Sequence, residues 1–363
     1  MAIRILGFIG GAAIVLNVID AALRTFVLPR GAPVMLTRLI ARGMRAIFDL
    51  IARPSATYDR RDRVMALYGP ITLVTFPAVW SSLVIVGFAL MFRSVGAPGW
   101  LDAFRYSGSS MLTLGFAMPS GGGPLILVLI EATIGLTLLA MLISYLPTIY
   151  GAFSARELAV TQLSVRAGSP PSSVDMLIRA HRAGFMDHLD DVWKQWENWF
   201  VQIEETHTSL AILPFFRSPN PSRSWVVAAG VVLDAAALRM AVLNIPFSPY
   251  GGLCLRSGYL SMRAIADFFG IDYDPDPQPG DPITISKDEF MAVYEQLAAE
   301  GVPVRANREQ AWRDFAGWRV NYDQILVVLA GLVVVPPVPW ISDRSIARHK
   351  PPMRNRGSRT PTT

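Results

Sequence analysis

The sequence predicts an all-α membrane protein, with three transmembrane helices, a re-entrant pore helix and selectivity-filter loop between the last two, and then a mostly helical domain. Three observations lead to this fold class. The 363 residues are 52% hydrophobic and only 17% charged, whereas a typical soluble domain carries about 25% charged residues. The deficit of charge is concentrated before residue 150, in three long apolar stretches. A polar, hydroxyl-rich segment separates the last two of them.

The three apolar stretches are long enough for transmembrane helices. Such a helix needs about 20 mostly apolar residues, and residues 5–28, 67–92 and 124–150 meet this requirement. The first stretch could instead be a signal peptide, but a single arginine precedes it and no small-residue cleavage site follows, so we expect a retained span. Asp20 and Arg24 in this span are four residues apart, a spacing at which the two charges share a helix face and pair.

The loop between the first two spans predicts the orientation. It carries eight arginines against three aspartates, so the positive-inside rule places it in the cytoplasm. We therefore expect a multi-pass protein of the cell (inner) membrane, with the N-terminus outside and the C-terminal domain cytoplasmic. The same basic loop is expected to bind anionic membrane lipids. Nucleic acid is not expected as a partner, although the net charge is +5, because topology already requires these arginines.

The segment between the last two spans has the residue types of an ion-selectivity loop. In such a filter, rings of backbone carbonyls replace the water around a permeating cation. A threonine adds a hydroxyl at the inner end, a glycine adopts backbone angles that other residues avoid, and an aromatic residue packs behind the strand. The predicted ion-conduction filter comprises Thr113, Leu114, Gly115, Phe116 and Ala117.

Pore support and gating are assigned to neighbouring residues. Residues 102–112 have the length of a short re-entrant helix. Glu131, in the third span, is expected to be tightly paired or functional; a structural role, with Arg105 or with hydrogen bonds from the re-entrant helix, is favoured over ion binding. Gly135 lies where an inner helix could bend. Pro147 is expected to kink or end the straight helix near its cytoplasmic end.

Residues 67–157 resemble the pore module of the bacterial two-transmembrane, one-pore-loop potassium channel family. The likeness rests on the motifs Thr-Leu-Gly-Phe, Glu-Ala-Thr-Ile-Gly and Ser-Tyr-Leu-Pro in that order. It implies a homotetramer with one loop per chain, a hinge at Gly135, and potassium as the permeant ion without a cofactor. The family continues with glycine and aspartate after the aromatic residue, whereas this chain has Ala117 and Met118. A non-selective cation channel therefore stays open as an alternative.

After residue 150 the composition becomes that of a soluble helical domain. Ser172 and Ser286 are expected to cap helices, and the tryptophans of residues 185–209 are expected to form a packed core stripe. Residues 225–243 are apolar, but we expect a buried helix of this domain. The predicted domains are an N-terminal transmembrane helix (1–29), a basic cytoplasmic linker (30–66), the pore module (67–150), a helical cytoplasmic domain (151–341) and a basic disordered tail (342–363).

Catalysis is not expected. All four histidines follow residue 150, so a serine at membrane depth, such as Ser109, has no histidine base in the predicted spans. The single cysteine, Cys254, can form neither an intrachain disulfide nor a metal-thiolate cluster. His181 and His188 are two helical turns apart, about 10 Å, so no metal site is expected there. The remaining alternative is a non-conducting, membrane-anchored sensor or scaffold.

Overall fold

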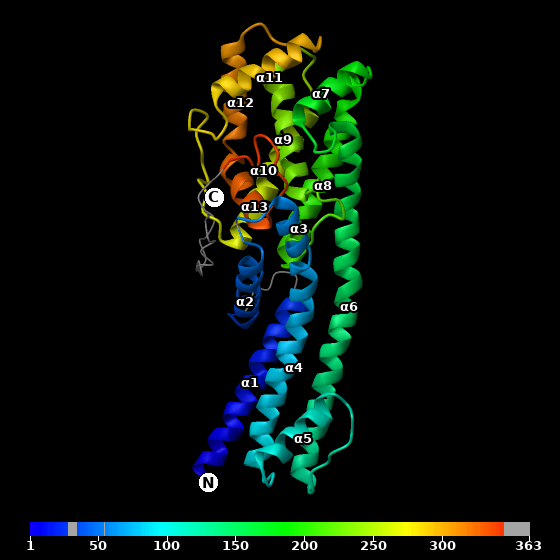
Figure 1. Ribbon diagram of the computed structural model, residues 1–363, viewed down its shortest axis with the longest axis vertical. Coiled ribbons are helices and arrows are strands. Elements are labelled where there is room, and N and C mark those ends of the chain that lie inside the picture. The colour runs from blue at the N-terminus through cyan, green and yellow to red at the C-terminus, as the bar shows by residue number, and fades with distance from the viewer. Residues whose placement is uncertain (28–34, 54, 345–363) are drawn as a thin grey trace. The chain divides into compact units, whose positions relative to one another are not determined.

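The computed structural model describes residues 1–27, 35–53 and 55–344. Within these ranges every regular element is a helix, apart from one isolated bridge between Leu243 and Val304, which confirms the all-α class (Figure 1). The chain divides into two compact units. The first unit comprises Met1–Ala56, Arg63–Ala152 and Ser209–Phe216, and the second comprises Thr57–Asp62, Phe153–Thr208 and the described residues from Arg217 onward.

Long apolar helices dominate the first unit. Its elements are α1 (Ala2–Phe26), α2 (Met35–Ile51), the last four residues of α3 (Tyr58–Ala66), α4 (Tyr68–Ser94), α5 (Trp100–Met111), the first part of α6 (Gly122–Ala167) and η2 (Leu213–Phe215). By length and composition α1, α4 and α6 can each cross a membrane, as the sequence predicts. These helices are those of a membrane protein.

The packing of α1 against α4 depends on glycine. A Cβ atom on Gly11 would lie 2.3 Å from the carbonyl oxygen of Gly87, and one on Gly87 would lie 2.9 Å from that of Gly11. One turn earlier, a Cβ atom on Gly7 would lie 2.8 Å from the hydroxyl of Ser94. Small residues allow helix backbones to approach closely within a membrane. Gly7 and Gly11 form a Gly-x-x-x-Gly motif that our interpretation of the sequence did not use.

The prediction that the helix could end near Pro147 is wrong. α6 continues past this residue to Ala167, well beyond the predicted span. A proline removes one backbone hydrogen bond from a helix, but the turns around it keep theirs. The hydroxyls of Ser144 and Thr148 also donate to the carbonyl oxygens four residues earlier, at 3.0 and 3.2 Å. α4 likewise contains an internal proline, Pro77.

The second unit is built around a buried central helix. Its helices after α6 are α7 (Ser173–Arg182), η1 (Met186–His188), α8 (Leu189–Ser209), α9 (Trp225–Val242), α10 (Pro249–Phe269), α11 (Lys287–Ala299), α12 (Arg308–Arg319) and α13 (Asp323–Val333). α9 is also long and apolar enough to cross a membrane, but 94% of it is buried inside the protein, as predicted. Trp193, Trp196 and Trp199 are all buried, which confirms the core stripe on α8.

Local signals mark several helix ends in the second unit as predicted. The hydroxyl of Ser172 accepts a hydrogen bond from the backbone N–H of Asp175 at the start of α7. Ser286 and Glu289 form a complete capping box at the start of α11. Gly270 ends α10 in the left-handed conformation, with φ of 67°, which glycine adopts without steric cost.

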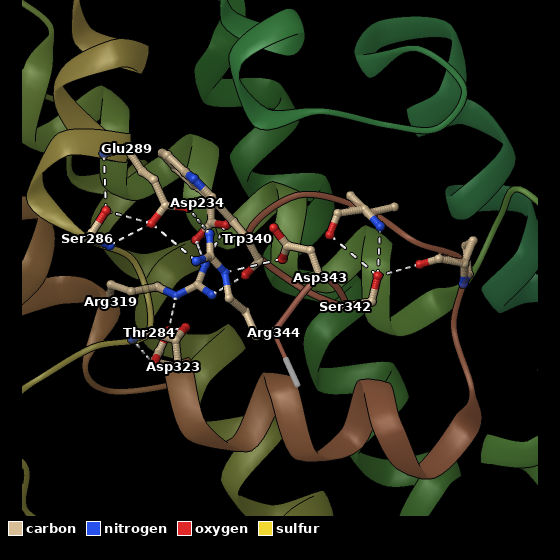
Figure 2. Close-up of polar contacts among 12 residues, drawn as sticks. Asp234, Thr284, Ser286, Glu289, Arg319, Asp323, Trp340, Ser342, Asp343 and Arg344 are labelled. Carbon is tan, nitrogen blue, oxygen red and sulfur yellow. Dashed lines mark hydrogen bonds and ion pairs between the residues drawn. The ribbon is translucent and has the colours of Figure 1, made fainter. Parts of the chain in front are cut away.

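A buried arginine links four segments of the second unit (Figure 2). Arg319, at the end of α12, is fully buried and donates to Asp234 of α9, to Asp323 at 2.8 Å and to the carbonyl oxygen of Trp340 at 2.6 Å. Tyr322 also donates to Asp234, at 2.8 Å. Burial alone would lower the pKa of Arg319, but the carboxylates of Asp234 and Asp323 raise it above its ordinary value. Each buried charge is thus paired.

A second ion pair, also drawn in Figure 2, lies beside this cluster. Arg344 donates to both carboxylate oxygens of Glu289, the residue of the α11 capping box, at 2.5 and 3.2 Å. This pairing lowers the pKa of Glu289 to about 2. The last described residue of the chain is therefore held against the first turn of α11.

Candidate functional site

The candidate site lies between α4 and α6 in the first unit. The chain leaves α4 at Ser94, forms the short helix α5, continues without helical structure from 112 to 121, and enters α6 at Gly122. α5 packs against α4. The five residues predicted to form the filter all fall in the non-helical stretch, and α5 covers most of the segment for which the sequence predicts a short helix.

Ser109 of α5 holds the loop through both its backbone and its side chain. Its carbonyl oxygen accepts from the backbone N–H groups of Leu114 and Gly115, at 2.9 and 3.3 Å. Its hydroxyl accepts from the N–H of Ala117 at 3.1 Å. The N–H of Thr113 bonds to the carbonyl oxygen of Ser110 at 3.0 Å. The start of the loop is thereby folded back onto the end of α5, and Ser109 itself is buried.

The loop backbone is left-handed at alternate residues. Thr113 has φ of 54° and Gly115 has φ of 69°. Glycine adopts positive φ freely, but a β-branched residue there is an outlier that costs about 1–3 kcal/mol. Strain of this kind persists only where surrounding contacts hold it, and it occurs most often at functional sites. The hydrogen bonds to Ser109 and Ser110 are such contacts.

The side chains of the loop point away from the core of their own chain. Leu114 is 61% exposed and Phe116 is 66% exposed. Phe116 is thus not packed behind the strand within a single chain. Thr113 is exposed too, and its hydroxyl donates to the carbonyl oxygen of Leu112 at 2.8 Å.

Glu131 of α6 is joined to α5. It is fully buried, and Ser107 of α5 makes a short hydrogen bond to its Oε1 atom. Ser107 Oγ also lies 3.0 Å from the carbonyl oxygen of Ile85 on α4. Of the two predicted structural partners, the short helix is therefore the one found, since Arg105 instead lies 3.8 Å from Asp102. The contact connects α4, α5 and α6 at one point.

Ser107 has two acceptors but only one hydroxyl hydrogen at this contact. The single hydroxyl hydrogen of Ser107 cannot be donated to Ile85 and to Glu131 at once. A proton on the Glu131 carboxyl group completes both bonds, because the acid then donates to Ser107 and Ser107 donates to Ile85. The other oxygen, Oε2, is buried and has no hydrogen-bond partner among the described residues.

Gly135 packs against the end of α5. A Cβ atom on it would lie 2.3 Å from the carbonyl oxygen of Met111, the last residue of that helix. This close approach by itself requires glycine, and our interpretation of the sequence did not foresee it. The hinge at Gly135 stays a prediction. Pro147 is exposed and about three turns further along α6, so it lies apart from the contacts that hold the loop.

Other chemistry has little support among the described residues. No group of three histidine, cysteine, aspartate or glutamate side chains is arranged to hold a metal ion in the part of the chain that the structure describes. Cys254 is buried, and burial raises the pKa of its thiol. A thiol in this state is a poor nucleophile.

Comparison with family models, with curated proteins and with solved structures gives no match to this chain. The candidate site therefore rests on its own geometry.

Proposed function

We propose that this chain is one subunit of a cation channel whose filter is the loop from Thr113 to Ala117. The observation that carries the proposal is the backbone of Thr113, a β-branched residue with φ of 54°, two residues before the left-handed Gly115. Left-handed backbone is used where the chain must approach a ligand closely. Carbonyl oxygens in such an arrangement are the ligands of a cation filter.

The surroundings of the loop support a cation as the ligand. α5 ends at Met111, directly before the loop, and the carboxyl end of a helix carries partial negative charge. Non-helical backbone is tolerated at membrane depth only beside protein or a water-filled cavity. A loop between two apolar helices meets this condition when it lines a pore.

One loop cannot form a ring, so the proposal includes a homotetramer. The exposed side chains of Leu114 and Phe116 are then covered by neighbouring subunits. Potassium is the proposed permeant ion. A non-selective channel is the alternative, because Ala117 and Met118 replace the residues that follow the aromatic in the potassium channel family. The arginine-rich loop before α4 supports a cytoplasmic position for the second unit, for which we propose a role as regulator of the gate.

The test is electrical recording from the purified full-length protein in planar bilayers with asymmetric potassium and sodium. We expect cation currents that Gly115→Ala abolishes, because alanine resists the left-handed conformation although its Cβ atom would contact nothing within 4 Å. Gly123→Ala is the matched control. It also adds a Cβ atom with no neighbour within 4 Å, but it does so where φ is not left-handed.

Three outcomes would contradict the proposal. One is no current across a range of pH, voltage and lipid composition, and another is a current that Gly115→Ala leaves intact. The third is a monomeric or dimeric mass in detergent. This last result would favour the non-conducting sensor or scaffold, for which the separate, well-packed core of the second unit is the supporting observation. Reversal potentials distinguish potassium selectivity from general cation conduction.

A further inference from the structure

α2 has a broad apolar surface, of which the first unit covers only part. Thr37 and Phe48 are buried, and Leu36, Ile40 and Ala41 pack against the core formed by α1, α4, α5 and α6. The uncovered face comprises five apolar side chains that remain exposed. Its exposed fractions are Met35 77%, Leu39 62%, Ile47 53%, Leu50 70% and Ile51 55%. A patch of this kind on one helix marks an interaction surface.

Contacts with the end of α1 and with the start of α4 fix the position of α2 within the first unit. The hydroxyls of Thr25, in the last turn of α1, and Thr37 are 3.1 Å apart. Tyr68, the first residue of α4, donates to the carbonyl oxygen of Ala41 at 3.3 Å. The ring of Tyr68 also packs edge-on against Phe48, with centroids 5.5 Å apart. α2 is therefore attached where α1 ends and α4 begins.

Basic side chains border the uncovered face. Arg38, Arg42 and Arg45 are spaced four and three residues apart, so they lie on one edge of the helix. Arg45 makes an ion pair with Asp49 at 3.1 Å and also lies over the ring of Tyr68. An apolar stripe beside an arginine edge is typical of helices that lie in the plane of a membrane surface.

We infer that α2 is an interfacial helix, bound to the bilayer surface at the side where α1 ends and α4 begins. Its occupant is the lipid itself: Leu39, Ile47 and Leu50 enter the acyl boundary and the arginine edge contacts anionic headgroups. The charge of the loop predicts only electrostatic attraction to lipid headgroups. The uncovered apolar face further predicts that α2 inserts into the bilayer surface. The inference requires that α1 and α4 cross the bilayer, and it does not depend on ion conduction.

The test uses spin labels on the full-length protein in vesicles of phosphatidylcholine and phosphatidylglycerol. Labels are attached at Leu39→Cys and Leu50→Cys, since the native Cys254 is buried. The control is Val201→Cys, because Val201 is 58% exposed on α8 of the second unit. We expect the α2 labels to collide more with oxygen, which concentrates in lipid, than with a water-soluble nickel chelate. The Val201 label should show the opposite preference.

Two results with these labels would overturn the inference. Access of nickel equal to that at Val201 would mean that the face lies in water. Protection from both reagents would mean that another protein surface, such as a second copy of this chain, covers it.

A charge variant tests the headgroup contact separately. Replacing phosphatidylglycerol by phosphatidylcholine should move the Leu39 label toward water, and Arg38→Gln with Arg42→Gln should remove that dependence on lipid charge. A label depth that does not respond to lipid charge in the unaltered arginine background would overturn the assignment of the arginine edge to anionic headgroups.

Discussion

α6 and α9 are both apolar enough to cross a membrane, yet the protein surrounds them differently. Within the most apolar stretch of α6 only 17% of the residues are buried, and the figure for α1 is the same. For α9 it is 94%. An apolar helix that remains exposed needs lipid as its solvent, whereas one that is enclosed by other helices forms a core. Burial thus separates two kinds of helix that hydropathy treats as one.

The two units also satisfy their polar groups differently. In the first unit, hydroxyls such as those of Thr75, Thr133 and Thr137 donate to the carbonyl four residues earlier in the same helix. Such bonds need no partner outside the helix, which suits a side chain facing lipid. The second unit instead buries a charged cluster centred on Arg319. We therefore expect close backbone packing to stabilise the first unit and charge pairing to matter in the second.

The largest expected effect is on Arg319. Arg319→Met leaves Asp234 and Asp323 buried without their counter-charge, and breaking a buried pair typically costs about 3–5 kcal/mol. Unfolding followed by tryptophan fluorescence reports on the second unit, whose core contains the α8 tryptophans. The control is Arg308→Met, which removes an exposed pair with Glu295 at 3.2 Å. Equal losses of unfolding free energy in the two variants would mean that buried charge pairing is not what distinguishes the second unit from the first.

The next largest effect concerns the α1–α4 contact. Gly11→Ala places a Cβ atom 2.3 Å from the oxygen of Gly87, and overpacking of this kind costs about 1–3 kcal/mol. Gly10→Ala is the matched control, because its Cβ atom would meet nothing within 4 Å. Resistance to unfolding by a denaturing detergent should fall for Gly11→Ala only. If both variants behave alike, close backbone packing does not determine the stability of the first unit.

A change of pH is expected to have an intermediate effect on the stability of the second unit. His207 is fully buried, and burial together with the charge of Arg156, 3.5 Å away, holds its pKa well below 6.5. The unfolded chain therefore takes up a proton below pH 6.5 that the folded unit does not. Stability should be fully present above pH 6.5 and fall by about 1.4 kcal/mol for each pH unit below it.

Melting temperatures between pH 8 and pH 5 measure this dependence, and His207→Gln should flatten it. The same slope in the variant would assign the dependence to another group. Glu289 is distinguishable because its pKa is lowered to about 2. Its contribution is complete above about pH 4.5, its unfolded value, and is lost only as the pH falls toward 2.

The smallest effect is expected at Ser107. Ser107→Ala removes the contact with Glu131 and Ile85, and a hydrogen bond between membrane helices contributes about 0.6 kcal/mol on average. Ser82→Ala is the control, since its hydroxyl bonds only within its own helix, to the carbonyl oxygen of Ala78 at 2.9 Å. We expect a small loss of detergent stability with a larger change in conductance. An unchanged conductance would mean that this contact does not position the loop.

Features set by neighbouring residues could be predicted from the sequence. The apolar helices, the buried α9, the tryptophan stripe and the caps at Ser172 and Ser286 follow from composition, periodicity and short motifs. The long-range contacts could not be predicted. Ser107 and Glu131 are 24 residues apart, and Arg319 and Asp234 are 85 residues apart, so no local pattern pairs them.

The site was predictable to the same extent. The residue types of the loop and its position between two spans identify it in the sequence. The hydrogen bonds of Ser109 to the loop backbone depend on how the chain folds back, which the sequence does not indicate. The role of Gly135 at Met111 likewise requires knowledge of which helix lies opposite. At Pro147 the local sequence signal misleads instead. Its local preference to break a helix is real, but it is outweighed within a helix as long as α6.

The position of Asp234 has a consequence for synthesis of the protein. α9 leaves the ribosome as another apolar segment after the membrane helices, and the insertion machinery must not treat it as a further span. Asp234 is at its middle, where an aspartate opposes insertion by about 2.5–3.5 kcal/mol. The residue that opposes insertion of this helix is also the carboxylate that Arg319 binds in the folded second unit. One charge thus serves both sorting and stability.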